Sequence, residues 1–303
     1  MTPSATGIDL ADTAQRPSAA CTPPPARRPL SVRSHGCTDK GKVRSSNEDQ
    51  FLIATLSKAL QVVQTSVEQP DVQIGGPQGY LFLVADGVGG SAAGEKASAM
   101  AVNSIENFAI DTLSWCSQLR TGADGDSLLG EFKTALGQAN DQLIREASRR
   151  PELHGMATTL TLAYFLHREL FVAHVGDSRC YLLRNNLLYR LTRDHTLVAE
   201  MVRRGLLKPE EAACHAHRHI VTNVVGGDDP GVQAEMHKMP LEGGDCILLC
   251  SDGLTEMVPE AEILDALLSD VRDPTTACDR LMKRANEKGG KDNVTVVVAR
   301  FEE

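Results

Sequence analysis

Several features that would place this chain in a well-defined class are missing from its sequence. No apolar run approaches the roughly 20 residues that a membrane-spanning helix needs, and residues 1–30 lack the apolar core of a secretory signal. The eight cysteines form no C-x-x-C pair. We therefore expect a soluble, cytoplasmic protein whose cysteines are buried free thiols, with no membrane partner.

Three catalytic signatures are also absent. The chain has no G-x-x-x-x-G-K-[ST] nucleotide loop, no G-x-S-x-G nucleophile elbow and no cysteine within a phosphate-binding loop. Hydrolysis through a metal-activated water is therefore favoured over a covalent enzyme intermediate. The formal net charge of −9 argues against nucleic acid or an anionic membrane as the main partner.

The composition predicts one globular unit behind a tail. Residues 1–29 are rich in Pro, Ala, Ser and Thr, and we expect them to be disordered because they cannot bury enough apolar surface to offset their conformational entropy. Residues 30–303 are 274 residues long, enough for a single domain with a sizeable core. Residues 56–78 contain Gln, Ser, Pro and Gly-Gly, so we expect a long connecting loop there.

Hydrophobic periodicity indicates an α+β protein with antiparallel sheets, since short turns join successive strands. We expect strands at 31–37, 50–55, 157–166, 169–184, 186–198, 246–250 and 294–301. We expect helices at 91–118, 126–149, 200–213, 259–270 and 274–288.

The most informative stretch is LFLVADGVGG, residues 81–90. Four apolar residues predict a strand buried on both faces, and the strand ends at Asp86 followed by Gly87. A carboxylate there is costly to desolvate unless a cation or hydrogen bonds compensate it. The glycine would leave its carbonyl oxygen open as a further ligand. Alone, this segment could equally be a simple turn.

The same pattern recurs along the chain. Asp252 follows the apolar strand 246–250, Asp292 precedes the last strand, and Asp177 and Asp49 also flank predicted strands. Oxygen-only ligands suit Mg²⁺ or Mn²⁺. Two such ions about 3.5–4 Å apart can bridge and deprotonate a water for in-line attack on a phosphoester.

Two polar segments leave alternatives open. Residues 44–49, RSSNED, are either a solvated turn or an anion-binding Arg44 beside acidic groups that hold a cation. Residues 198–228 contain Cys214, His215, His217 and His219, and the alternation would place the histidines on one strand face. A zinc site is one interpretation, and a mobile surface segment with exposed histidines is the favoured one.

Five ordered motifs resemble those of the metal-dependent type 2C protein serine/threonine phosphatases, and in particular the compact bacterial branch. They are RSSNED (44–49), LVADGVGG (83–90), VGDSR (175–179), CSDGLTEMV (250–258) and KDNVTVVVAR (291–300). The resemblance covers residues 30–303. It implies a four-layer αββα sandwich, with two central antiparallel sheets flanked by helix pairs. It also implies two Mg²⁺ or Mn²⁺ ions and a weaker third site.

The resemblance further implies roles for single residues. Asp86 would bridge the two ions, and the Gly87 carbonyl oxygen would bind the second one. The other residues that it assigns to metal are acidic: Asp252 and Asp292 on the first ion, Glu48 and Asp49 on the second ion or its waters, and Asp177 on the third.

Arg44 matches the phosphate-binding arginine of these phosphatases, and residues 198–228 match their flap beside the active site. Val88 stands where eukaryotic relatives often carry a histidine proposed as general acid, so we name no general acid. We expect dephosphorylation of phosphoserine and phosphothreonine in proteins, a serine/threonine kinase among the partners, and a monomer. The alternative is a catalytically weak relative that acts as a kinase-binding regulatory module.

Overall fold

A computed structural model describes residues 29–61, 72–113, 125–212, 214–228, 231–269 and 273–303. Apart from its last residue, the tail expected at 1–29 lies outside this part of the chain. Within the described residues, no helix is both long and apolar enough to cross a membrane.

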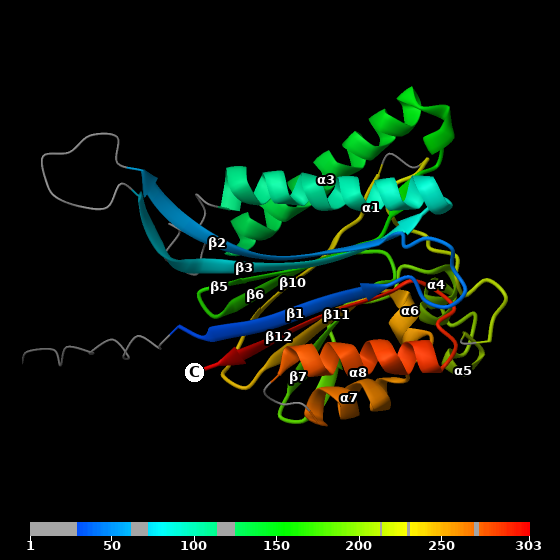
Figure 1. Ribbon diagram of the computed structural model, residues 1–303. Helices are drawn as coiled ribbons and strands as arrows, with labels where there is room; N and C mark the ends of the chain where they lie inside the picture. The colour runs from blue at the N-terminus through cyan, green and yellow to red at the C-terminus, as the bar shows by residue number, and fades with distance from the viewer. Residues whose placement is uncertain (1–28, 62–71, 114–124, 213, 229–230, 270–272) are drawn as a thin grey trace, which may run out of the picture.

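Two antiparallel sheets lie face to face between two pairs of helices, which confirms the expected αββα sandwich (Figure 1). The smaller sheet has the strand order β1-β12-β11-β7-β8, and the larger has β10-β6-β5-β3-β4-β9 with β2 paired to β3. The strands of the smaller sheet are β1 (Ser31–Asp39), β7 (Arg179–Arg184), β8 (Leu187–Arg190), β11 (Cys246–Cys250) and β12 (Val294–Glu302). Those of the larger sheet are β2 (Asp49–Gln61), β3 (Val72–Val88), β4 (Ala157–Thr158), β5 (Leu160–Leu166), β6 (Glu169–Val175), β9 (Val225–Gly226) and β10 (Glu235–Pro240).

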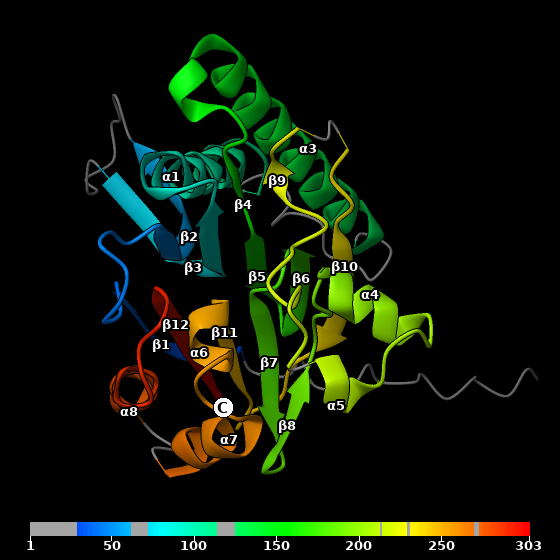
Figure 2. The same ribbon diagram turned by 90° about the vertical axis from the view of Figure 1, so that its right-hand side faces the viewer.

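The helices cover the outer faces of the two sheets. Viewed along the strands, one pair lies above the larger sheet and the other below the smaller one (Figure 2). The upper pair is α1 (Ser91–Phe108) with α3 (Gly125–Arg149), and the lower pair is α7 (Glu260–Ser269) with α8 (Pro274–Glu287). Shorter helical segments are η1 (Ala109–Leu113), η2 (Pro151–Leu153), α4 (Leu197–Arg203), α5 (Pro209–Ala212) and α6 (Asp252–Thr255).

Strand β3 shows why a continuous apolar run is needed at the centre of the sandwich. Successive side chains point to opposite faces of a strand. Leu81 and Leu83 therefore pack against α1 and α3, whereas Phe82 and Val84 enter the core between the sheets. All four side chains are fully buried, as expected for a strand covered on both faces.

The core between the sheets joins residues that are far apart in sequence. The rings of Phe165 on β5 and Phe301 on β12 meet edge to face, with centroids 4.7 Å apart. Such contacts add to the stabilisation from burial. This core holds the two sheets together, so the ends of their strands keep a fixed spacing.

The prediction of a loop at 56–78 is largely wrong. Strand β2 continues to Gln61 and β3 begins at Val72, so the two strands form a long hairpin (Figure 1). The pairing shifts register on both sides of Ser57, whose partner is Pro77. A bulge of this kind accommodates a proline that would interrupt a regular strand.

Several other predicted elements differ in extent. The strand expected at 169–184 is two strands, β6 and β7, which belong to different sheets. Helix α1 ends at Phe108 and continues as the π-helical turn η1, and the rest of the expected helix 91–118 is outside the described residues. The helix expected at 200–213 is two short ones, α4 and α5, because Gly205 (φ 71°) ends the first and Pro209 starts the second. The strand expected at 186–198 is limited to β8.

We expect Phe301→Ala to lower the free energy of unfolding by about 3–5 kcal/mol, because it empties a fully buried site between the sheets. Chemical denaturation followed by circular dichroism measures the change. Tyr189→Ala on edge strand β8, where the ring is 47% exposed, is the control and should cost less than about 1 kcal/mol. Equal losses for the two variants would contradict the assigned core.

Candidate metal centre

The pairing of β2 with β3 brings together two of the predicted ligands. Asp49 at the start of β2 lies opposite Asp86 near the end of β3. Asp49 Oδ2 accepts hydrogen bonds from the hydroxyls of Ser251 and Thr295, each at 2.7 Å, while its Oδ1 is buried without a partner. The carboxylate is thus anchored from the smaller sheet and keeps one oxygen open.

The smaller sheet supplies two further acidic residues at the same end of the sandwich. Asp252 begins α6 directly after β11, and Asp292 lies two residues before β12. Asp177 joins them from the turn between β6 and β7. Oδ1 of Asp252 is buried without a hydrogen-bond partner, like that of Asp49.

The electrostatics of Asp86 show that these carboxylates converge. Burial is the main cause that raises the pKa of Asp86 well above its usual range, and the next causes are the charges of Asp49, Asp252, Asp177 and Asp292. The pKa of Asp252 is likewise raised by burial and then by its acidic neighbours. Burial is also the main cause that raises the pKa of Asp49 to about 6 and that of Asp177 to about 7.

A divalent cation fits this site. Buried carboxylates that repel one another are stable as anions only when a positive charge compensates them. Two carboxylate oxygens are already desolvated and unpartnered, and every side-chain donor assigned from the sequence is an oxygen. Such a donor set suits Mg²⁺ or Mn²⁺.

Two glycines allow the backbone of helix α1 to approach the remaining predicted ligands. A Cβ on Gly94 would collide with Oε2 of Glu48, and one on Gly87 would collide with the carbonyl of Gly94. The carbonyl of Glu48 accepts hydrogen bonds from the Ser98 hydroxyl at 2.6 Å and from the Gly87 amide at 3.2 Å. These contacts place Glu48 and Gly87 beside the carboxylate cluster.

Arg44 reaches the same cluster. One of its terminal nitrogens donates to Oδ2 of Asp292 at 2.6 Å, and about half of the side chain is exposed. This hydrogen bond to Asp292 is the main cause that raises the pKa of Arg44. Glu48 and Asp49 are buried, so residues 44–49 are not merely a solvated turn. All eight residues named as metal or phosphate ligands lie at one end of the sandwich.

The sequence did not single out the residues that hold the cluster in place. Oδ1 of Asn293 accepts from the amide of Glu48 at 2.8 Å, and its Nδ2 donates to the carbonyls of Lys40 and Ser46. Asn293 thereby ties the segment before β2 to the segment before β12. Its position immediately after Asp292 was the only sequence signal available.

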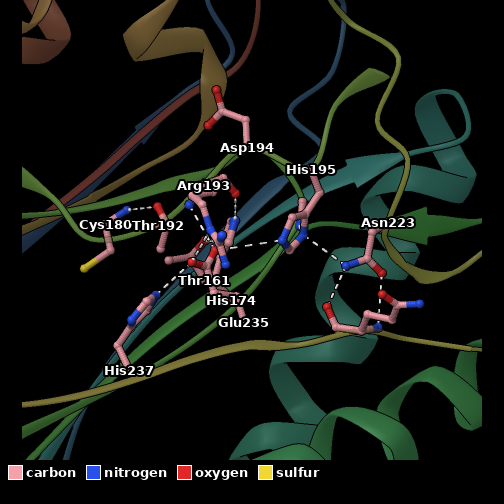
Figure 3. Close-up of polar contacts among 12 residues, drawn as sticks. Thr161, His174, Cys180, Thr192, Arg193, Asp194, His195, Asn223, Glu235 and His237 are labelled. Carbon is pink, nitrogen blue, oxygen red and sulfur yellow. Dashed lines mark hydrogen bonds and ion pairs between the residues drawn. The ribbon is translucent and has the colours of Figure 1, made fainter. Parts of the chain in front are cut away.

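A second polar network surrounds His174 and His195 (Figure 3). Nδ1 of His195 accepts from the amide of Gly176 at 3.1 Å and contacts Nδ2 of Asn223 at 3.0 Å. His174 is buried beside it, with its Nε2 3.0 Å from the carbonyl of Arg193 and its Nδ1 2.9 Å from the hydroxyl of Thr161. The network connects the turn that bears Asp177 to the end of the segment 198–228.

The histidines of that segment do not share a strand face, as the alternation had suggested. Residues 214–219 run through turns, and the rings of His215 and His217 contact each other. His219 pairs instead with Glu256 at 2.7 Å, next to the carboxylate cluster. Within the described chain, the zinc site considered for Cys214, His215, His217 and His219 does not form, because His219 is grouped with Asp252 and Glu256 instead.

A cavity of about 1080 Å³ is lined both by this segment and by two of the predicted metal ligands. The ligands are Asp177 and Asp252, and the segment contributes Arg203, Arg218 and Thr222. A substrate bound in the cavity would therefore contact the predicted metal ligands and residues 198–228 at the same time.

Comparison with known proteins places the chain in a family. A family model described as Protein phosphatase 2C matches residues 68–288, more than half of the sequence. This chain belongs to the protein phosphatase 2C family. The motif resemblance noted in the sequence is thereby confirmed.

Individual relatives of this phosphatase 2C family member support the same assignment. The serine/threonine phosphatase stp of Listeria welshimeri is 36% identical over 261 residues, which are 86% of this chain and 92% of that protein. The crystal structure of the Mycobacterium tuberculosis serine/threonine phosphatase PstP/Ppp is 32% identical, with a TM-score of 0.72, and the match covers 90% of this chain and 100% of that one. A second crystal structure, of the PstP catalytic domain in complex with two manganese ions, has a TM-score of 0.70 at 32% identity and the same coverage.

We expect His174 to make this family member less stable in acid. Burial, and then the neighbouring His195, lower the pKa of His174 to about 4 in the folded protein, whereas the ring titrates near 6.5 when unfolded. Protonation therefore favours the unfolded chain. The destabilisation is absent above the unfolded value and grows as the pH falls towards 4, reaching about 2 kcal/mol at pH 5.

Urea unfolding of the wild type and of His174→Gln at pH 7 and pH 5 tests this expectation. The acidic cluster has raised pKa values and changes stability with the opposite sign, but it does so equally in both proteins. The wild type should lose about 2 kcal/mol more than the variant between the two pH values. Identical losses would show that His174 does not titrate as described.

Proposed function

We propose that this protein hydrolyses phosphoserine and phosphothreonine on other proteins with the aid of Mg²⁺ or Mn²⁺. The observation that carries the proposal is the convergence of buried carboxylates with two unpartnered oxygens, in a member of the protein phosphatase 2C family. Named serine/threonine phosphatases among its relatives, one of them holding two manganese ions, support it.

The roles proposed for the ligands are those that the family resemblance implies, and the clustering of these residues supports them. Asp86, opposite Asp49 in the larger sheet, would bridge two ions, with the Gly87 carbonyl on the second. The other proposed ligands are Asp252 and Asp292 for the first ion, Glu48 and Asp49 for the second ion or its waters, and Asp177 for a weaker third. When bound, such ions supply the nucleophile by activating a water for in-line attack on phosphorus.

Arg44 is the proposed ligand for the phosphate. Its guanidinium presents several donors in a fork that matches two phosphate oxygens, and the contact with Asp292 uses one nitrogen. The side chain is half exposed, so its other donors remain open to a ligand beside Asp292. Arg44 would thus hold the phosphoryl group next to the carboxylates.

The proton for the leaving hydroxyl comes from water in this proposal. Val88, two residues after Asp86, is 38% exposed and carries no titratable group. An aliphatic side chain cannot donate a proton. We therefore assign no side chain as general acid.

The proposal also covers the setting in which the enzyme works. A serine/threonine kinase makes the phosphoproteins that this reaction consumes, so a kinase is a natural partner and substrate. Six described cysteines are free thiols, which supports a reducing cytoplasm. We further propose a monomer with one catalytic domain at 30–303, whose flap is formed by residues 198–228.

We expect p-nitrophenyl phosphate to be hydrolysed with Mn²⁺ and not after removal of the metal with a chelator. Asp86→Asn should lower turnover by at least about 100-fold, because a neutral amide is a poor bridging ligand.

Binding of Mn²⁺ stabilises a folded protein by about 2.7 kcal/mol when the free Mn²⁺ concentration is 100 times Kd. The wild type should therefore show a rise in Tm on adding Mn²⁺, and Asp252→Ala should not.

Two outcomes would contradict this. A rise in Tm that persists in Asp252→Ala would remove Asp252 from the ligand set. Inactivity of the wild type with every divalent metal would favour the regulatory-module alternative.

Arg44→Ala should raise the KM for a phosphate ester by about 10- to 100-fold, since a hydrogen-bonded charge pair contributes roughly 1.5–3 kcal/mol. The affinity for Mn²⁺, measured by calorimetry, should change far less. Arg44→Lys keeps the charge but loses the forked guanidinium, so its KM should lie between that of the wild type and that of Arg44→Ala. Equal losses of metal and phosphate binding would count against the assigned role.

A further inference from the structure

The charges that line the cavity between the flap and the carboxylate cluster are unevenly paired. Six of the lining residues are Arg or Lys. Four of them have acidic partners: Arg179 and Arg190 bind Asp194, Arg193 binds Glu235, and Arg203 binds Glu200. The charges of these four side chains are therefore already paired within the protein.

The other two lining cations are Arg218 and Lys291. Both are exposed, and within the described part of the chain neither forms an ion pair. They come from distant parts of the chain, since Arg218 lies on the flap and Lys291 directly precedes Asp292, and both line the same cavity.

None of the remaining acidic groups of the cavity forms an ion pair with them. Asp177 and Asp252 belong to the proposed metal centre, and Glu256 contacts His219 of the flap at 2.7 Å. Arg218 directly precedes His219 in the chain. With the metal ligands occupied, the cavity has an excess of positive charge next to the catalytic site.

We propose that Arg218 and Lys291 form a second anion-binding subsite, which selects substrates that carry another anionic group close to the phosphorylated residue. This rests on the proposed phosphatase function and specifies its substrates. The anionic group is a phosphate or a carboxylate, because both offer oxygens that a guanidinium and an ammonium bind. Arg44 holds the phosphate to be hydrolysed, and the new subsite holds its neighbour.

Three phosphothreonine peptides that differ at one neighbouring position test the proposal. That position carries serine, glutamate or phosphoserine. The quantity compared is the ratio of kcat/KM for each anionic peptide to that for the neutral peptide, measured on one preparation of Mn²⁺-loaded enzyme. A ratio is independent of the fraction of enzyme that is folded, so a partly misfolded variant still gives a valid result.

The wild type should prefer an anionic peptide by about 10-fold or more, equivalent to about 1.4 kcal/mol. Arg218→Ala and Lys291→Ala should each reduce that ratio, and the double variant should bring it close to one. Arg203→Ala is the matched control, since it removes a lining cation that is already paired with Glu200, and its ratio should stay at the wild-type value. A larger ratio for phosphoserine than for glutamate identifies phosphate as the preferred group, and the reverse identifies carboxylate.

The proposal is overturned if the wild type shows no preference, if the double variant keeps it, or if Arg203→Ala reduces it as much as Arg218→Ala does. Failure of the proposed function itself looks different, because p-nitrophenyl phosphate and all three peptides would then remain unhydrolysed. Raising the ionic strength should lower the wild-type ratio, since the two cations are exposed to solvent.

Discussion

The structure depends on the mutual repulsion of carboxylates that are buried at one end of two stacked sheets. Removing one such group from water is costly, and placing others beside it adds to the cost. This cost is offset chiefly by the burial of apolar side chains between the sheets and under the helices. The cluster therefore raises the free energy of the folded protein, and a bound divalent cation would offset this cost by compensating the negative charges.

Hydrogen bonds between the two sheets hold the carboxylates close together despite their repulsion. Asp49 is held by hydroxyls of the opposite sheet, and Asn293 joins two segments that enter different sheets. Neither contact is local in sequence. Because these hydrogen bonds span both sheets, the ligands cannot move apart to relax their repulsion without breaking the contact between the layers.

The sequence predicted what depends on local pattern. Asp86 and Asp252 could be found because each closely follows an apolar run, and the burial of β3 on both faces could be found because its run 81–84 is continuously apolar. The network around His174 and His195 could not, because its members become neighbours only through tertiary packing. Residues 56–78 were misjudged because glycine and proline usually interrupt strands, whereas a bulge in a long hairpin accommodates them.

The pairing of β1 with β12 has a consequence for how the enzyme can be joined to other molecules. Ser31 is paired with Glu302, while Asp39 and Val294 are paired at the end that carries the metal centre (Figure 1). The start of β1 and the end of β12 therefore lie on the side of the sandwich remote from the metal centre. A fused domain or an affinity tag joined after Glu303 would leave the entrance to the catalytic site clear.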